Sequence, residues 1–260
     1  MEEVRYWETV VNTWNAARPQ TLWRFHSDAV NLALVASWLA EGRVQRLLKT
    51  DAFDEALGDG LYSFLVSKAE QVVSVDIAVS VLSAARARHS GLPATRADVR
   101  HLPFADGVFD VVVSNSTLDH LASLDEIVTS LLELHRVLRE GGQLLLTLDN
   151  LANPIIALRS VLPFRLLHCL GIVPYYVGAT CGPYRLRRML QRAGFEVREV
   201  SAVMHCPRML AVVLAYVLER YARVETQRRF LRFLMAFEYL ACWPIRFLTG
   251  YFVAVRAIKH

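Results

Sequence analysis

The chain has 260 residues, which suits one large α/β domain or a domain that carries a sizeable insertion. Hydrophobic residues make up 54% of it, so a core is easily built and some apolar surface is left over. The formal net charge is +4, but no basic run is interleaved with aromatic residues, which argues against a nucleic-acid partner.

The N-terminal sequence and the cysteines favour a cytoplasmic protein. The first residues, MEEVRYWETV, are too acidic and too polar for a secretory signal. No charge-free run of about 18 apolar residues occurs, so a membrane-spanning helix is not expected. No CxxC pair and no set of histidines, cysteines and acids with ligand spacing is present, so we predict no metal and four reduced thiols, Cys169, Cys181, Cys206 and Cys242.

Residues 4–41 are predicted to be helical, because apolar residues recur at helical spacing before and after Pro19. We assign residues 1–44 to an N-terminal helical cap.

From Leu47 onwards, short apolar runs alternate with amphipathic stretches. The runs are RLLKT, QVVSVD, ATRAD, FDVVVSNS and GQLLLTLD, and helix-like segments lie between them at about 60–69, 78–89 and 124–139. Strand–helix alternation of this kind predicts a doubly wound, parallel α/β sheet. The central runs are apolar at successive positions, as parallel strands that helices cover on both faces must be.

After Asp149 this alternation loosens. A helix is expected in GPYRLRRMLQRAGF, a strand in EVREVSAVMH, very apolar helices over 207–248 and a closing strand in GYFVAVRAIKH. The predicted organisation is a Rossmann-like domain over 45–206 and 250–260, interrupted by an apolar helical insertion at 207–249.

The stretch LLKTDAFDEALGDGL, residues 47–61, begins like a buried strand and ends in Gly58 and Gly60, as a ligand-cradling loop would. It also carries four acids, Asp51, Asp54, Glu55 and Asp59. Such a loop would repel the pyrophosphate of a dinucleotide but attract a cationic ligand. The absence of a clean GxGxxG therefore argues against a nicotinamide-dependent oxidoreductase.

Polar residues also stand where the later strands are expected to end. Asp76 closes VVSVD, where it could accept hydrogen bonds from both hydroxyls of a ribose or cap the next helix. Asp98 ends the third strand and could bond an exocyclic amine of an adenine. Ser114, Asn115 and Ser116 end the fourth strand and should face the same crevice.

Several short motifs together resemble a family signature. They are Ala-Asp followed by Leu-Pro-Phe, Phe-Asp-Val-Val at the fourth strand, Leu-Asp-His after it, and Leu-Arg-Glu-Gly-Gly before the fifth strand. This pattern resembles the class I S-adenosylmethionine-dependent methyltransferases, especially the small-molecule group that includes ubiquinone and menaquinone C-methyltransferases. The resemblance covers about residues 45–149. It implies a mostly parallel seven-stranded sheet that ends in an antiparallel hairpin, with N-terminal helices and a helical insertion before the last strand.

The resemblance also implies S-adenosylmethionine as the cofactor and assigns residues to its parts. Asp76, followed by Ile77, would hold the ribose, and Asp98 with Val99 would hold the adenine. Asn115 would lie under the methionyl part.

The first loop departs from the family pattern, because Lys49 stands where the family has an acid and the loop is several residues longer. The cofactor carries an ammonium and a sulfonium, so a replacement carboxylate is expected. The predicted loop ligands are Asp51, Asp54 or Glu55, together with Gly58 and Gly60.

The reacting groups are predicted after the fourth strand. His120, with Asp119, is expected to act as a base or to orient the substrate; a helix-start histidine bonded to backbone is the alternative. Residues at the crevice and on the N-terminal helix are expected to line the acceptor site: Asp149, Asn150, Tyr175, Tyr176, Thr180 and His26, with Asp28 beside the last.

The helices over 207–248 combine apolar runs with surrounding arginines. A basic amphipathic surface predicts peripheral membrane contact at the inner face of the membrane; a lid on the core or a homodimer interface is the alternative. Either suits a small hydrophobic acceptor, such as a natural product or lipid precursor, which is the predicted methylation substrate. The competing hypothesis is a non-catalytic or repurposed member that acts as a partner in a biosynthetic complex.

Overall fold

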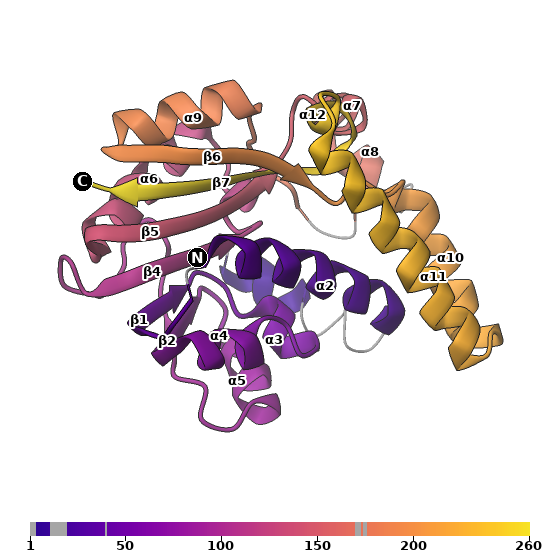
Figure 1. Cartoon of the computed structure of the whole chain (residues 1–260), viewed down its shortest axis with the longest axis horizontal. Coiled ribbons are helices and arrows are strands. Elements are labelled where there is room, and N and C mark those ends of the chain that lie inside the picture. Colours follow the sequence, from indigo (N-terminus) through magenta and orange to yellow (C-terminus); the bar gives the residue numbers. More distant parts are fainter. Residues whose placement is uncertain (1–3, 11–19, 40, 170–172, 174–175) are drawn as a thin grey trace.

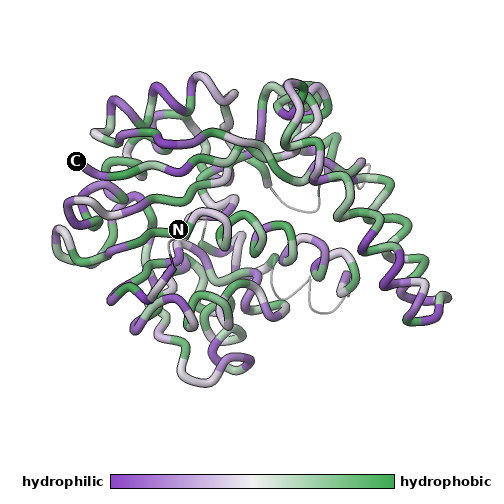
Figure 2. The backbone as a smooth tube through the Cα atoms, viewed as in Figure 1, coloured by the Kyte–Doolittle hydropathy of each residue, from purple (hydrophilic) through white to green (hydrophobic). Residues whose placement is uncertain are grey.

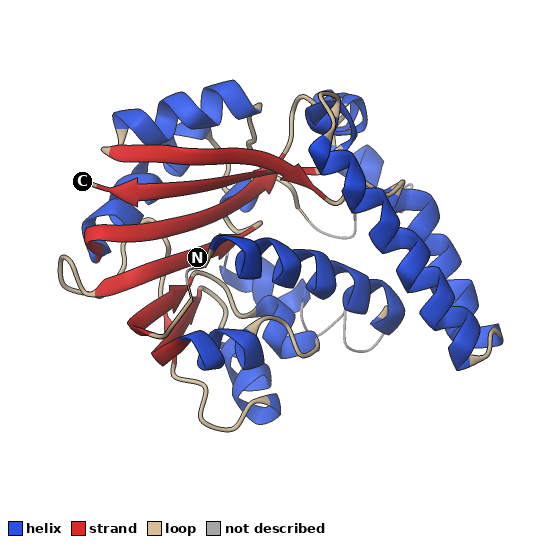
Figure 3. Ribbon diagram, viewed as in Figure 1, coloured by secondary structure: helices blue, strands red, loops and turns tan. Residues whose placement is uncertain are grey.

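The computed structural model describes residues 4–10, 20–39, 41–169, 173 and 176–260. A twisted sheet lies at the centre with helices on both of its faces (Figure 3). Two long helices near the C-terminal end of the sequence extend beyond one end of that sheet (Figure 1).

Seven strands form one sheet in the order β3-β2-β1-β4-β5-β7-β6. Their bounds are Val44–Lys49 (β1), Ala69–Asp76 (β2), Ala94–Arg96 (β3), Phe109–Asn115 (β4), Leu138–Asp149 (β5), Phe195–Val203 (β6) and Phe252–Lys259 (β7). The first five strands pair in parallel, whereas β7 pairs antiparallel with both β5 and β6. The predicted doubly wound, mostly parallel sheet with a terminal antiparallel hairpin is thereby confirmed.

The helices that connect these strands have the following bounds: α2 Thr21–Trp38, α3 Phe53–Leu57, α4 Tyr62–Lys68, α5 Val79–Arg88, η1 Leu118–His120, α6 Leu124–Val137, α7 Pro154–Val161, α8 Phe164–Cys169, α9 Pro183–Arg192, α10 Arg208–Tyr221, α11 Val224–Ala236, η2 Phe237–Cys242 and α12 Arg246–Thr249. Residues 4–10 are also helical. The last four elements form the helical insertion between β6 and β7.

The core has two main layers because the central strands bury side chains on both faces. On β5, Leu144, Leu146 and Leu148 pack toward α6 and α9, whereas Leu145 packs on the opposite face with side chains of α2, α4 and α10. Side chains of a strand alternate between faces, so successive leucines serve both layers. This is why the strands read as continuous apolar runs in the sequence.

The strand order reverses direction between β1 and β4, which lie side by side at the centre of the sheet. In open α/β sheets a ligand crevice forms at such a point, beyond the carboxyl ends of the strands. The residues that follow β1, β2, β3 and β4 are therefore brought together at one edge.

The helical insertion is fixed to the sheet at its base. The Glu238 carboxylate, on η2, accepts hydrogen bonds from the backbone N–H groups of Met204 (3.0 Å) and His205 (2.9 Å), just after β6. The His205 ring lies 2.8 Å from Thr249 Oγ1 and 2.9 Å from the carbonyl oxygen of Ala202. His205 is thus a structural histidine that joins α12 to β6.

Candidate active site

A cavity of about 150 Å³ lies at the crevice edge of the sheet. Segments that follow four strands supply its walls, and the helical residues 4–10 close one side of it. The lining residues are Trp7, Thr50, Asp51, Phe53, Asp54, Asp76, Ile77, Val81, Asp98, Val99, Asn115, Ser116, Thr117, His120 and Leu121.

Four of these residues are aspartates, which gives the cavity an acidic rim. Two of the four have arginine partners: Asp54 pairs with Arg24 at 3.3 Å, and Asp98 pairs with Arg100 at 2.7 Å. Burial opposes ionisation of Asp98, but the hydrogen bonds and charge of Arg100 lower the pKa of that carboxyl below its usual range. The rim is therefore ionised in part and suits a cationic ligand.

Asp76 is held at the carboxyl end of β2 by backbone donors. Its Oδ1 accepts from the N–H of Ala78 (2.9 Å) and its Oδ2 from the N–H of Ala52 (3.1 Å). Burial raises the pKa of Asp76 to about 6, although these hydrogen bonds act in the opposite direction. Ile77 follows it on the cavity wall. Each carboxylate oxygen has a lone pair left, so both hydroxyls of a ribose could donate to Asp76.

The atypical first loop is organised around a buried cation. Lys49 Nζ lies 2.8 Å from Glu55 Oε2 and 3.1 Å from Asp51 Oδ1, and the Lys49 side chain is 1% exposed. Burial alone would lower the pKa of Lys49, but the nearby carboxylates of Asp51 and Glu55 raise it, so the lysine stays charged. Asp51 accepts a further hydrogen bond from Thr117 Oγ1 at 3.2 Å, which places it on the cavity wall.

Glu55, Gly58 and Gly60 do not line the cavity. Glu55 is fully buried, with one carboxylate oxygen on Lys49 and the other accepting from the N–H of Leu61 at 3.0 Å. Gly60 has φ +54, and a Cβ atom there would lie 2.5 Å from Glu55 Oε1. These three residues shape the loop behind the cavity, so among the predicted loop ligands the structure brings only Asp51 and Asp54 to it.

The end of β4 offers a buried hydrogen-bond donor. Asn115 lies on the cavity wall, and its Nδ2 is buried without a hydrogen-bond partner within the described residues. Ser116, next in the chain, has φ +49, an uncommon conformation for a residue with a side chain. A buried donor facing an acidic cavity fits a ligand with both a cationic part and an acceptor group, as the amino-acid end of S-adenosylmethionine has.

His120 stands on the same wall with its ring held on both sides. Its Nδ1 lies 3.1 Å from the carbonyl oxygen of Tyr176, and its ring centroid is 4.7 Å from that of Trp7. A carbonyl only accepts, so Nδ1 carries the proton and Nε2 is the basic nitrogen of the neutral ring. That Nε2 is 3.9 Å from Asp119 Oδ1.

Asp119 is buried behind His120 and joins a network outside the cavity lining. Its Oδ2 accepts from Ser116 Oγ at 2.7 Å and from the N–H of Asp149 at 3.3 Å. Asp149 is paired with Arg159, and its pKa rises to about 6 because of burial and of the nearby Asp119 charge. Asp119 and Asp149 thus support the wall from behind.

The remaining residues predicted for the acceptor site are dispersed. Asn150 is fully buried and donates to the carbonyl oxygens of Phe247 (2.7 Å) and Gly250 (2.9 Å). Thr180 Oγ1 donates to the carbonyl oxygen of Asp149. Tyr176 meets His120 through its backbone, and Tyr175 lies outside the described residues.

His26 is not at the cavity. It is fully buried in the layer under α2, where its Nε2 lies 3.4 Å from Cys206 Sγ, and burial lowers its pKa to about 4. Asp28, two residues along the same helix, lies near the first loop, and burial together with Asp54 and Glu55 raises its pKa to about 7. His26 is therefore a neutral core histidine in this structure.

Sequence reasoning missed several lining residues. Trp7 was predicted only as part of a helix, and no local pattern signals its contact with His120 across the chain. Thr50 and Phe53 could have been found from their place directly after β1, and Thr117 from its place after β4.

Part of the chain is similar in sequence to known methyltransferases. Residues 53–146 match the family model described as a methyltransferase domain. Among curated proteins, a malonyl-[acyl-carrier protein] O-methyltransferase of Hamiltonella defensa is 32% identical over 98 residues, 37% of this chain and 37% of the relative. A ubiquinone/menaquinone biosynthesis C-methyltransferase of Haemophilus ducreyi is 29% identical over 154 residues, 52% of this chain and 58% of the relative. The matches span less than two thirds of either relative.

The likeness of fold extends over the whole chain. A Thermotoga maritima S-adenosylmethionine-dependent methyltransferase, described as a possible histamine N-methyltransferase, superposes with a TM-score of 0.61 over 99% of this chain and 100% of that one, at 17% identity. At this identity the comparison shows the fold. The methyltransferase-domain match over residues 53–146, the curated relatives and the fold together support a class I S-adenosylmethionine-dependent methyltransferase, for which S-adenosylmethionine is the indicated cofactor.

Proposed function

We propose that the chain transfers a methyl group to a small, hydrophobic acceptor such as a natural product or a lipid precursor. The observation that carries the proposal is His120, whose basic nitrogen is fixed on the wall of the acidic cavity by the Tyr176 carbonyl. The Haemophilus ducreyi relative, named for ubiquinone and menaquinone biosynthesis, supports an apolar acceptor by analogy. The exposed apolar side chains of α10 and α11 would suit an acceptor that is held at a lipid surface.

The residues of the chain would divide the work as follows. Asp76 and Asp98 hold the ribose and the adenine, and Asp51, Asp54 and Asn115 hold the amino-acid end. When bound, S-adenosylmethionine supplies the electrophilic methyl group. His120 Nε2 takes the proton that the acceptor's nucleophilic atom loses, and the Asp119 carboxylate lies close enough to stabilise the imidazolium. Positioning the acceptor in line with the methyl group supplies much of the remaining acceleration.

The test combines cofactor binding with transfer. The protein is incubated with methyl-labelled S-adenosylmethionine and an organic-solvent extract of cells, and label is counted in the apolar fraction. His120→Gln should bind the cofactor like the wild type but transfer about 100-fold more slowly, because general-base catalysis contributes about that much. Asp76→Asn should lose cofactor binding in calorimetry, whereas Asp59→Asn, at an exposed loop position, should not.

A second function stays open because of one observation. Lys49 neutralises two of the loop carboxylates, and such a loop also fits the altered cofactor loop of a non-catalytic partner protein. The fold alone does not decide, since one fold hosts many functions. Cofactor binding without any transfer, unchanged by His120→Gln, would favour this second candidate over the first.

A further inference from the structure

The α10–α11 arm, residues 208–236, has an unusual distribution of apolar side chains. The two fully buried residues of α10 are small: Ala211 and Ala215 pack against the layer that contains α2, with the partly buried Val212 and Leu218 beside them. Its outer side spans about 160° of the helix circumference. Along it lie seven exposed apolar or aromatic side chains and one arginine: Met209, Leu210, Val213, Leu214, Tyr216, Val217, Tyr221 and Arg220. The helix thus turns its larger apolar face to the outside.

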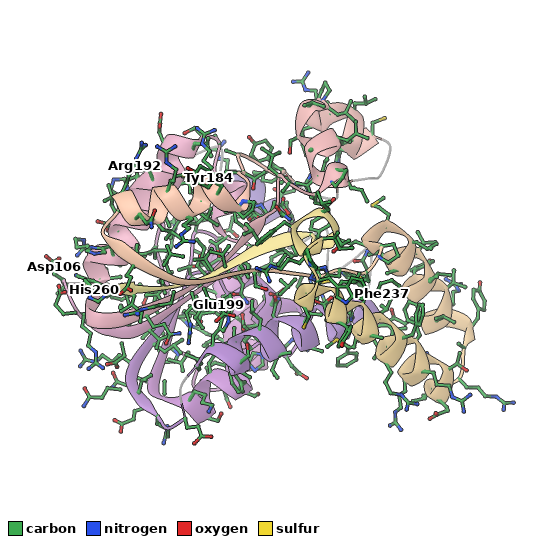
Figure 4. All side chains as sticks on the ribbon, turned by 45° about the horizontal axis from the view of Figure 1, so that its top comes forward. Asp106, Tyr184, Arg192, Glu199, Phe237 and His260 are labelled. Carbon is green, nitrogen blue, oxygen red and sulfur yellow. The ribbon has the colours of Figure 1, made fainter. Side chains whose placement is uncertain are left out.

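Apolar exposure continues to the end of the arm. Tyr221 is 77% exposed and Val224 is 62% exposed, on either side of the turn between the two helices. Exposed arginines flank this turn, namely Arg220, Arg223 and Arg228. In Figure 2 the arm is largely hydrophobic along its length with hydrophilic segments toward its far end, and in Figure 4 side chains that end in nitrogen extend from that end.

The charge of the arm is as unusual as its hydropathy. Residues 208–236 contain six arginines and two glutamates, which gives them a formal charge of +4. The whole chain also has a net charge of +4, from 29 basic and 25 acidic residues. The rest of the chain is therefore neutral overall, and the excess positive charge is concentrated beside the exposed apolar face.

A surface that is both apolar and cationic fits the interface of an anionic lipid bilayer, where aliphatic and aromatic side chains enter the headgroup region and arginines meet lipid phosphates. A second copy of the chain fits less well, because a two-fold interface would place each cationic arm against its own like. None of the helices in the described ranges is long and apolar enough to cross a bilayer, so contact would be at the surface.

We infer that the α10–α11 arm docks the protein on an anionic membrane surface. The arm and the carboxyl ends of the parallel strands lie at the same end of the molecule, so docking would bring the cavity edge toward the lipid (Figure 1). The inference rests on the proposed function, because an apolar acceptor in the lipid would be the reason for the protein to dock there. Lipid binding is measured without cofactor, so its failure is distinct from a failure of methyl transfer.

The experiment is co-sedimentation of the full chain with vesicles of phosphatidylcholine alone or mixed with phosphatidylglycerol. Binding should require phosphatidylglycerol and weaken at high salt. Two double variants test the arm: Leu210→Asp with Val213→Asp, and Arg223→Glu with Arg228→Glu. Each should bind the anionic vesicles at least about tenfold more weakly than the wild type. These side chains are exposed, and thermal unfolding of each variant checks that the fold is kept.

Matched controls carry the same chemical changes elsewhere. Leu132→Asp alters a side chain on α6 that is 50% exposed, and Arg187→Glu, Arg192→Glu reverses two exposed charges on α9. Figure 4 places Arg192 far from the arm. Both controls should bind like the wild type. No binding to anionic vesicles, equal loss in controls and arm variants, or a dimer in light scattering that Leu210→Asp, Val213→Asp dissociates would overturn the inference.

Discussion

Among single residues, Asp76 should make the affinity for S-adenosylmethionine depend on pH. Its carboxyl has a pKa of about 6 in the free protein because it is buried, and ribose hydroxyls would donate to its ionised form. The affinity for S-adenosylmethionine should therefore be constant above about pH 7 and fall as the pH drops through about 6, by up to about tenfold per pH unit. Calorimetric titrations between about pH 5 and pH 8 measure this. An affinity that is flat across this range would contradict the role of Asp76.

Lys49 gives a prediction about stability. Replacing it by methionine leaves the buried Glu55 carboxylate without its cation, which should cost about 3–5 kcal/mol of the free energy of unfolding. Adding Glu55→Met to Lys49→Met removes both charges and should restore much of that loss. Denaturant titrations of the two variants give the values. A single variant as stable as the wild type would show that the pair does not hold the loop.

At the scale of elements, the helical residues 4–10 are docked on the cavity by polar contacts. The Glu8 carboxylate accepts from the N–H groups of Val79 (2.6 Å) and Ser80 (3.0 Å) at the start of α5, and the Tyr6 hydroxyl meets the N–H of Tyr176. A carboxylate at a helix N-terminus satisfies donors that the helix itself leaves open.

Glu8→Ala should release this docking. The backbone amides of Val79 and Ser80 should then exchange their hydrogens faster, while amides in the middle of β4 should not change. Hydrogen exchange followed by mass spectrometry measures both segments in one experiment. Thr9→Ala, one position along, is the matched control, because the Thr9 hydroxyl donates to the carbonyl oxygen of Arg5 within the same helix and not to α5 in the way that Glu8 accepts from it. Unchanged exchange in Glu8→Ala would show that the helix is held by other contacts.

The strands could be predicted from the sequence, whereas the first loop could not. Leu144 to Leu148 alternate between two buried layers, so their apolar run indicates a central strand by itself. In a parallel sheet, residues at the carboxyl ends of the strands meet at one edge, where ligands bind. This general rule predicts the cavity positions of Asp76, Asp98, Asn115 and His120. Glu55, in contrast, faces away from the cavity because it pairs with the buried Lys49, and Gly60 packs against Glu55. A single acid-rich stretch of sequence does not show which of its acids will pair with a lysine.

Two residues predicted for the acceptor site were also misplaced, because their partners lie on distant elements of the chain. Asn150 has the residue type and strand-end position of a ligand-binding residue, yet it holds the backbone of the segment that leads into β7. His26 resembles a site histidine in the sequence, but it is buried against Cys206, which lies between β6 and the insertion. Such partners come from residues far away in the chain, so periodicity cannot reveal them.

At the scale of the whole molecule, cofactor binding should stabilise the fold by mass action. A hundredfold excess of S-adenosylmethionine over its dissociation constant adds about 2.7 kcal/mol, which corresponds to a few degrees in the unfolding temperature of a chain of this size. Scanning calorimetry should show this upward shift with S-adenosylmethionine and none with NADH, because the acidic rim repels a pyrophosphate. A shift with NADH alone would point to a different cofactor.

The most direct measurement is a crystal structure of the chain with S-adenosylmethionine. We expect the ribose hydroxyls on Asp76, the adenine beside Asp98 and Val99, and the amino-acid end between Asp51 and Asn115, with the methyl group facing His120. A cavity that remains without the cofactor at saturating concentration, or a cofactor bound elsewhere on the molecule, would contradict the account.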